Sequence, residues 1–587
     1  MADHAVGRLV AALSGLRDTV AEVRYPLALP ESEHALAAAA AMADQLDDYL
    51  LPRLGRLDAP LLVVVGGSTG AGKSTLVNSL VRATVSEAGV LRPTTRAPVL
   101  VCHPDDAPWF TEAHLLPGLE RTTSRPTRTD SLQVVSAEGL TPGLAFLDAP
   151  DIDSVVDANR ALAVQLLAAA DLWLFVTTAA RYADAVPWEL LRTARSRGTA
   201  IALVLDRVPA GAADAIGPHL TGMLRANDLG GAPLFVLPEI RLEQELLPDR
   251  IVAPLRDWFA ALAKSAAARA AVVRQTLDGA VAALGPAVEQ LAVAATDQVD
   301  AADILAAGVS AAYRDAEAAV EQGVRDGALL RGEVLARWQD LVGTGDLMRG
   351  LQARVGRLRD RMSAAVTGHP EPAQRLQEAL GSGLVVLVRN AAADASERVV
   401  ANWRAHPAGG ALLETPEAAI DLTASSADLP ERVERLVRDW QRSVVELVRT
   451  EAGGKRKAAR AGAFAVNATG LLVMVSVFAA TSFIPTGLEV AVAGGTTVAA
   501  QKVLEAIFGD QAIRKLADNA RRDLLTRMHA LLGEEADRFL SVLDNAGIDP
   551  TAADRLRRAA VTTEAARAAT PLPGGPGLPQ PILNGVQ

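Results

Sequence analysis

Residues Gly67 to Ser74 have the types and spacing of a loop that binds phosphate. They read G-S-T-G-A-G-K-S, which satisfies the pattern G-x-x-x-x-G-K-[ST]. A β-branched apolar run precedes the loop and a helical pattern follows it, which is the context that this motif requires. The glycines let the backbone wrap so that successive N–H groups point at phosphate oxygens. The start of the next helix adds partial positive charge. The sequence therefore predicts a phosphate-binding loop.

Each polar side chain of this loop has an expected role. Lys73 would neutralise the β- and γ-phosphates of a nucleotide, and the Ser74 hydroxyl would ligate Mg²⁺. The residues expected to surround the nucleotide are Gly67, Ser68, Thr69, Gly70, Ala71, Gly72, Lys73, Ser74 and Thr75. The loop alone does not identify the nucleotide or what its binding drives.

A second acidic motif favours a GTPase over a general ATPase. In "LAFLDAPDID", Asp148 follows an apolar run, and Ala149 stands where an ATPase has a catalytic glutamate. D-A-P-D is similar to the D-x-P-G form of the GTPase D-x-x-G motif, whose aspartate holds Mg²⁺ through a water. Asp151 replaces the glycine whose N–H senses the γ-phosphate, so this position keeps its N–H but gains a negative charge.

The remaining nucleotide contacts are expected from two later segments. GTPases place a threonine on a mobile loop to reach Mg²⁺ and the γ-phosphate. In "LRPTTRAPVLV" this indicates Thr95, with Thr94 as the alternative. In "AIALVLDRVPA", Asp206 and Arg207 occupy the place of the base-recognition motif N-K-x-D, whose final aspartate is absent at position 209. We expect guanine as the base, with adenine left open.

The elements that position these residues alternate between strand-like and helical runs. The apolar runs LLVVV, PVLVC, SLQVV, LAFLD, LWLFV, AIALVLD and PLFVL lie between residues 61 and 240. Strands that alternate with helices predict a mostly parallel sheet covered on both faces. We therefore expect an α/β P-loop GTPase domain followed by a long all-α bundle. The expected segments are N-terminal helices at 1–58 that pack with the bundle, the GTPase domain at 59–262, a helical bundle or stalk at 263–455, a hydrophobic membrane hairpin at 456–509, a returning bundle helix at 510–548 and a partly disordered tail at 549–587.

The hairpin is the most unusual segment. No charged residue occurs from 461 to 488, and basic residues flank both ends of the segment. One membrane pass requires roughly 20 predominantly apolar residues. Ala463–Thr481 fits one such pass, and the basic flanks favour cytoplasmic ends. A transmembrane hairpin and a paddle in one leaflet both fit, and a buried hairpin inside a soluble bundle is the alternative.

Composition restricts the remaining possibilities. The 587 residues carry a net charge of −11, so the chain lacks the basic character of a nucleic-acid-binding protein. The single cysteine, Cys102, excludes a disulfide framework. The first twenty residues show no apolar stretch of signal-peptide length, so we expect a cytoplasmic N-terminus.

Taken together, the GTPase motifs, the T-R-x-P segment, the helical bundle and the late apolar hairpin resemble the bacterial dynamin-like proteins, which are TRAFAC-type P-loop GTPases. The resemblance implies GTP and Mg²⁺ as cofactors, with Lys73, Thr95 and Asp148 as catalytic residues. It implies Ser74, Thr95 and Asp148 around the metal, the last through water. Dynamins usually place glutamine where this loop has Thr69.

The same resemblance implies a membrane-associated enzyme. The expected function is GTP binding and hydrolysis that drive self-association and membrane remodelling or stabilisation, with lipid and a homo-oligomer or paired paralogue as partners. The expected place is the cytoplasmic face of the membrane, with both termini cytoplasmic. The alternatives are a nucleotide-gated membrane scaffold with little hydrolysis and a soluble Era-like, ribosome-associated GTPase.

Overall fold

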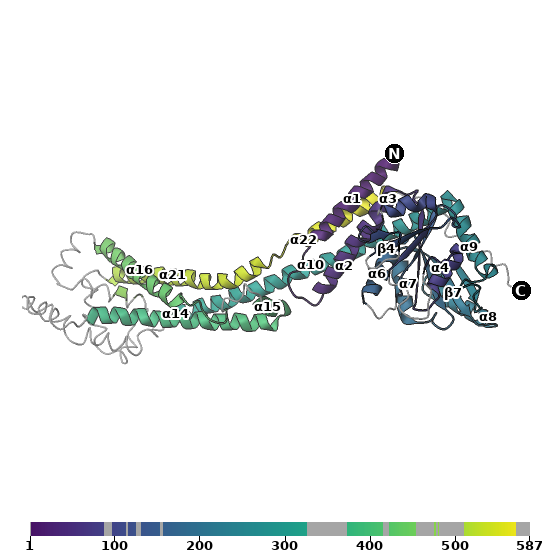
Figure 1. The fold of residues 1–587 in the computed structure, drawn as a ribbon. Helices are drawn as coiled ribbons and strands as arrows, with labels where there is room; N and C mark the ends of the chain where they lie inside the picture. Colours follow the sequence, from purple (N-terminus) through teal and green to yellow (C-terminus); the bar gives the residue numbers. More distant parts are fainter. Residues whose placement is uncertain are drawn as a thin grey trace, which may run out of the picture. The chain divides into compact units, whose positions relative to one another are not determined.

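The computed structural model describes residues 2–86, 97–112, 115–124, 131–152, 157–325, 372–414, 422–452, 475–476, 479 and 510–570. The chain forms two compact units. The first comprises residues 1–25, 31–297 and 549–587, and the second comprises residues 26–30 and 298–548. Helix α10 (Ala266–Arg325) contributes to both. The predicted fold class, an α/β domain with a long helical region, is confirmed (Figure 1).

The first unit is built around an eight-stranded sheet in the order β3-β4-β2-β5-β1-β6-β7-β8. The strands are parallel to their neighbours except where β2 pairs antiparallel with β5. Their bounds are β1 Leu61–Gly67, β2 Val99–Cys102, β3 Glu120–Thr122, β4 Ser131–Ser136, β5 Leu144–Asp148, β6 Leu172–Thr178, β7 Ala200–Val208 and β8 Leu234–Pro238. All seven predicted apolar runs form strands, and β3 is an additional one.

Both faces of the sheet are covered by apolar side chains. Alternate residues of a strand point to opposite faces of the sheet, so the clusters that they join show what covers each face. In β6, Leu172 and Leu174 belong to one apolar cluster, while Trp173 and Phe175 belong to another. Every residue of β1 and β6 is buried, as expected for central parallel strands. The helices around the sheet (Figure 1) are α4 Lys73–Val81, α5 Ala107–Thr111, α6 Asp157–Ala168, α7 Ala185–Ser196, α8 Ala213–Ala226 and α9 Asp249–Lys264.

A buried ion pair fixes the N-terminal helices to the sheet. These helices are α1 Ala2–Glu22, α2 Ser32–Gln45 and α3 Leu51–Gly55, with a π-helical turn at Leu46–Leu50. Arg53 contacts the Asp171 carboxylate at 2.9 Å, and neither side chain is exposed. Tyr49 Oη and the Leu62 N–H also donate to this carboxylate, at 3.0 and 2.7 Å. The donors compensate for removing the charges from water.

Helix α10 packs closely against the same end of the sheet. Its Thr276 hydroxyl donates to the Asp171 carbonyl oxygen at 2.8 Å and accepts the Ala200 N–H at 3.1 Å. One turn later, a Cβ on Gly279 would lie 2.5 Å from Gly198 Cα, so only glycine allows this approach.

Helix α22 (Ala552–Ala568) packs on α1 within the first unit. Arg555 donates to Glu22 of α1 at 2.8 Å, and Arg557 donates to Glu289 of α10 at 2.9 Å. Residues 549–587 were predicted to be a partly disordered tail, and α22 is the helix that the structure describes within them. Leu556 of this helix is fully buried. The Pro- and Gly-rich residues 571–587 lie outside the described residues.

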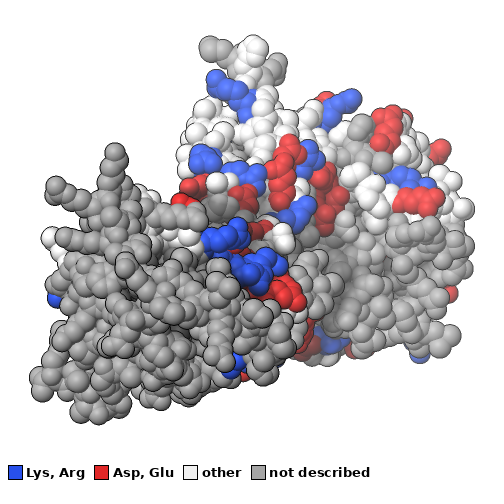
Figure 2. All heavy atoms as spheres, turned by 90° about the vertical axis from the view of Figure 1, so that its left-hand side faces the viewer, with Lys and Arg blue, Asp and Glu red and all other residues white. Residues whose placement is uncertain are grey.

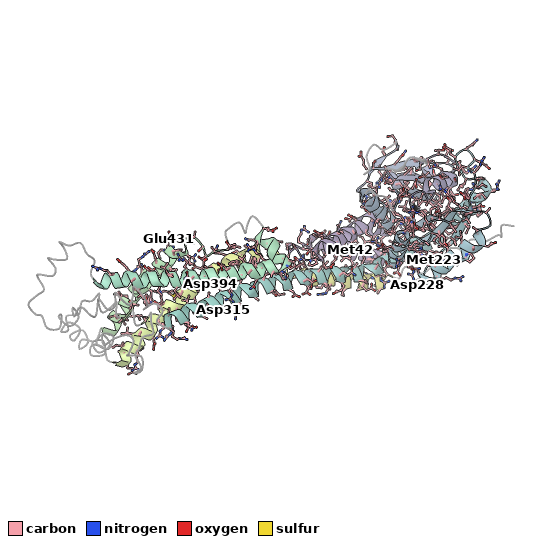
Figure 3. The ribbon with its side chains drawn as sticks, turned by 90° about the horizontal axis from the view of Figure 1, so that it is seen from below. Met42, Met223, Asp228, Asp315, Asp394 and Glu431 are labelled. Carbon is pink, nitrogen blue, oxygen red and sulfur yellow. The ribbon has the colours of Figure 1, made fainter. Side chains whose placement is uncertain are left out.

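The regular secondary structure in the described residues of the second unit is all helix. Its helices are the later part of α10, α14 Pro372–Ala405, α15 Pro407–Leu413, α16 Leu429–Ala452 and α21 Asp510–Asn545. One apolar core joins them, with Trp403 packed edge-on against Phe539. Figure 3 labels Asp315 of α10 and Asp394 of α14, and Asp315 accepts a 2.6 Å hydrogen bond from Arg398. On the face in Figure 2, acidic and basic side chains lie interspersed over the described residues.

Glu535 of α21 is a buried acid in this unit. The Ser426 N–H donates to it at 2.8 Å, and Arg432 and Arg538 each donate at 2.9 Å. Burial alone would raise the pKa of Glu535, but the hydrogen bonds from Ser426 and Arg538 outweigh burial and hold the pKa below its usual range. This carboxylate joins the start of α16 to α21.

The predicted membrane hairpin at 456–509 lies outside the described residues except at Val475, Ser476 and Ala479, which are buried. By length and composition, α10 is the one helix in the described ranges that could cross a membrane. Of its most apolar stretch, 44% is buried inside the structure.

Candidate functional site

The predicted phosphate loop joins β1 to α4 at the carboxyl edge of the sheet. Gly70 and Gly72 have φ values of 74° and 90°, a left-handed conformation that favours glycine. A Cβ on Gly67 would lie 2.0 Å from the Val176 carbonyl oxygen of β6, so this position also requires glycine. Helix α4 begins at Lys73, so the N–H groups of its first turn lie at the end of the loop. The backbone therefore has the form of a phosphate cradle.

The expected nucleotide-contact residues lie together in this loop. Gly67, Ser68, Ala71 and Lys73 are buried, while Thr69, Gly70, Gly72, Ser74 and Thr75 are partly exposed. The Ser68 hydroxyl is buried and has no hydrogen-bond partner among the described residues.

The Lys73 ammonium is held inside the loop. It donates to the carbonyl oxygens of Gly67 and Ser68 at 3.0 and 3.3 Å. It also forms an ion pair with Asp151, whose side chain is 24% exposed against 6% for Lys73. Asp151 is the residue that stands in place of the GTPase glycine. Its carboxylate is the negatively charged partner of Lys73 in this structure, a role that a phosphate would take in a nucleotide complex.

Asp148 lies at the end of β5, directly beside β1, in register with Val65. Its Oδ2 accepts hydrogen bonds from Ser74 Oγ at 2.6 Å and from Ser86 Oγ at 2.5 Å. Its Oδ1 is buried without a hydrogen-bond partner among the described residues. Complete burial raises the pKa of the Asp148 carboxyl, while the two hydroxyls and Lys73 oppose that rise.

These groups fit a hydrated magnesium ion. Mg²⁺ prefers oxygen ligands and keeps several waters. The Ser74 hydroxyl and the Asp148 carboxylate are oxygen donors already in contact, and the orphaned Oδ1 is an acceptor suited to a metal-bound water. The third predicted ligand, Thr95, and its alternative Thr94 lie outside the described residues.

The structure also brings Asp206 and Arg207 to the loop. They lie near the end of β7, where Asp206 is in register with Thr178 of β6. A Cβ on Gly72 would lie 2.6 Å from Asp206 Oδ2, so the carboxylate lies against the loop backbone. Burial raises the pKa of Asp206, and the nearby Glu239 carboxylate adds to the rise. Arg207 is exposed, with a left-handed φ of 55°.

Two further residues contact this site. Arg181 donates to the Thr69 carbonyl oxygen at 3.1 Å and to Asp184 at 3.0 Å, so it links the loop after β6 to the phosphate loop. Ser86 was missed because no motif spacing connects it to Asp148.

Fold and site together define an α/β P-loop domain joined to a helical unit. No family model matches the chain, and no curated protein matches it. Two solved chains are similar over nearly their whole length, both from work on an oligomerised bacterial dynamin pair that senses and tethers membranes over long range. One has 10% identity and a TM-score of 0.42 and covers 94% of this chain and 96% of its own length. The other has 10% identity and a TM-score of 0.40, with 96% and 94% covered.

Proposed function

We propose that this chain is a membrane-associated, dynamin-like GTPase. The observation that carries the proposal is the convergence of Lys73, Ser74 and Asp148 at the carboxyl edge of β1 and β5. A loop that offers backbone N–H groups, an ammonium and a hydroxyl–carboxylate pair at one point suits a nucleoside triphosphate with Mg²⁺. When bound, Mg²⁺ would neutralise charge on the phosphate oxygens, and Ser74, Asp148 and Thr95 would hold it.

Binding requires Lys73 to exchange partners. Its ammonium leaves the Asp151 carboxylate and turns to the β- and γ-phosphates, which are stronger multivalent acceptors. The α4 N-terminus and the loop N–H groups then hold the phosphate oxygens. Hydrolysis also requires an oriented water, and Thr69 occupies the place where dynamins usually position it with glutamine.

Guanine is the base that the site favours. Asp206 lies at the loop in the place of the usual asparagine, and Arg207 is exposed beside it, with its Nε 3.8 Å from Asp206 Oδ2. Ala149 follows Asp148, so the general base of an ATPase is missing at that position. Adenine is the competing base in the test below.

The membrane part of the proposal is supported by the sequence at 461–501. Its uncharged stretch and basic flanks suit a hairpin that enters the cytoplasmic face of a membrane, with both chain termini cytoplasmic. Self-association, as a homo-oligomer or with a paralogue, would place several such hairpins on one surface and let nucleotide binding remodel or stabilise it.

The test combines nucleotide titration with turnover on liposomes. We expect the purified chain to bind GTP more tightly than ATP, to bind liposomes, and to hydrolyse GTP faster when liposomes are present. Turnover should be lost in Lys73→Ala. Binding without turnover would favour a nucleotide-gated membrane scaffold. GTP turnover in a protein that stays soluble and ignores liposomes would favour a soluble Era-like GTPase.

A further inference from the structure

Ser86 contacts the same carboxylate oxygen as the predicted magnesium ligand Ser74. Its hydroxyl lies 2.5 Å from Asp148 Oδ2, and the Ser74 hydroxyl lies 2.6 Å from that atom. Ser86 is 62 residues before Asp148 in the chain and is itself only 3% exposed. Hydrogen bonds to a carboxylate are charge-assisted, so this contact is stronger than one between neutral groups.

A buried amide holds Ser86 in this place. Asn78 of α4 donates through Nδ2 to the Ser86 carbonyl oxygen at 2.7 Å. Its Oδ1 accepts the N–H groups of Val85 and Ser86, both at 2.9 Å. Asn78 lies one helical turn after Ser74, so a single helix supplies one hydroxyl directly and fixes the peptide that carries the other. Buried hydrogen bonds of this kind rigidify the groups that they join.

The hydrogen bonds to Oδ2 of Asp148 also determine where its other oxygen, Oδ1, lies. Two donors on Oδ2 fix the rotation of the planar carboxylate, since both must keep their hydrogen bonds. Oδ1 of Asp148 is buried and has no hydrogen-bond partner among the described residues. Because the carboxylate cannot rotate, this acceptor oxygen is held in one position. A magnesium-bound water is the kind of donor that such an acceptor suits.

We propose that Ser86 is a positioning residue of the Mg²⁺ site, which orients Asp148 so that Oδ1 receives a metal-bound water. The proposal rests on the proposed nucleotide-binding function. Ser86 touches neither nucleotide nor metal in this role and acts through Asp148. Its removal therefore lowers the gain in nucleotide affinity that Mg²⁺ provides and leaves the metal-free affinity in place.

The experiment measures GTP affinity of the full chain with Mg²⁺ and with EDTA, by fluorescence of a labelled GTP. Ser86→Ala is compared with wild type, with Ser86→Thr, which restores a hydroxyl, and with Ser196→Ala. Ser196 is an exposed serine of the same domain whose hydroxyl bonds only the Thr193 carbonyl, so it controls for loss of a hydroxyl elsewhere. Thermal unfolding of each variant reports its folding.

We expect Ser86→Ala to reduce the ratio of Mg²⁺ to EDTA affinities about tenfold, the effect of losing one hydrogen bond to a charged group. Ser86→Thr should recover most of the ratio, and Ser196→Ala should keep it. An unchanged ratio in Ser86→Ala overturns the proposal, as does an equal loss of affinity in both buffers. If wild type binds no GTP in either buffer, the proposed function fails first and this inference fails with it.

Discussion

Asp151→Asn should increase the affinity for GTP, because the Asp151 carboxylate competes with phosphate for Lys73. The ion pair is partly buried, with side chains 24% and 6% exposed. Two unit charges about 4 Å apart attract by about 1 kcal/mol in water and about 4 kcal/mol at an effective dielectric constant of 20. The exposure of Asp151 places the pair nearer the weaker limit. We expect a gain of about 1–2 kcal/mol, which is about 5- to 30-fold in affinity.

The substitution keeps the size of the side chain and the backbone N–H, so it changes mainly the charge. The gain should be larger for GTP than for GDP, since a γ-phosphate adds negative charge that Asp151 repels. Calorimetric titration of both nucleotides into wild type and Asp151→Asn measures this. Asp249→Asn is the matched control, because Asp249 pairs with Arg256 outside the loop. Unchanged or weaker GTP binding in Asp151→Asn would refute the competition between carboxylate and phosphate.

Three further predictions concern stability, each measured by thermal or chemical unfolding. Gly279→Ala should destabilise the first unit by about 1–3 kcal/mol, because the new Cβ would overlap the backbone of Gly198. The control is Gly285→Ala, where no neighbouring atom lies within 4 Å of the new Cβ, and this change should stabilise the unit by about 0.5–1 kcal/mol. Equal effects of the two substitutions would contradict the close packing at Gly279. Asp171→Ala should cost about 3–5 kcal/mol because it leaves Arg53 charged and buried, and a loss below about 1 kcal/mol would argue against the ion pair. Glu535 has a lowered folded pKa, so its stabilisation is present above the usual glutamate pKa of about 4.3 and is lost as the pH falls through the folded pKa. Glu535→Gln should thus be less stable than wild type at neutral pH and lose less on acidification, and parallel pH profiles would contradict this.

The sheet and the phosphate loop could be predicted because local signals and tertiary context agree there. Apolar runs of five to seven residues bounded by turn signals become strands, and the glycine spacing of the loop follows from its backbone conformation. The edge strand β3 was missed because three partly polar residues, Glu120–Thr122, carry no apolar pattern. Its existence depends on pairing with β4, which no local signal encodes.

The side-chain network of the site was only partly predictable. Motifs identified Lys73, Ser74 and Asp148, because their roles require fixed residue types at fixed spacing. Ser86 could not be found this way, since its role depends on the clamp by Asn78 rather than on a motif. Thr95 stays a prediction, and the guanine assignment to Asp206 and Arg207 stays one as well.

The central claim is that the loop at Gly67–Ser74 binds a nucleoside triphosphate through Lys73. Its most direct test is a titration of GTP with Mg²⁺ into the wild-type chain and into Lys73→Ala, with unfolding temperatures to confirm that both are folded. The account predicts saturable binding by wild type and an affinity about 10- to 100-fold lower in the variant, the effect of losing hydrogen bonds to a charged phosphate. Equal binding by the two proteins, or no binding by wild type, would contradict it.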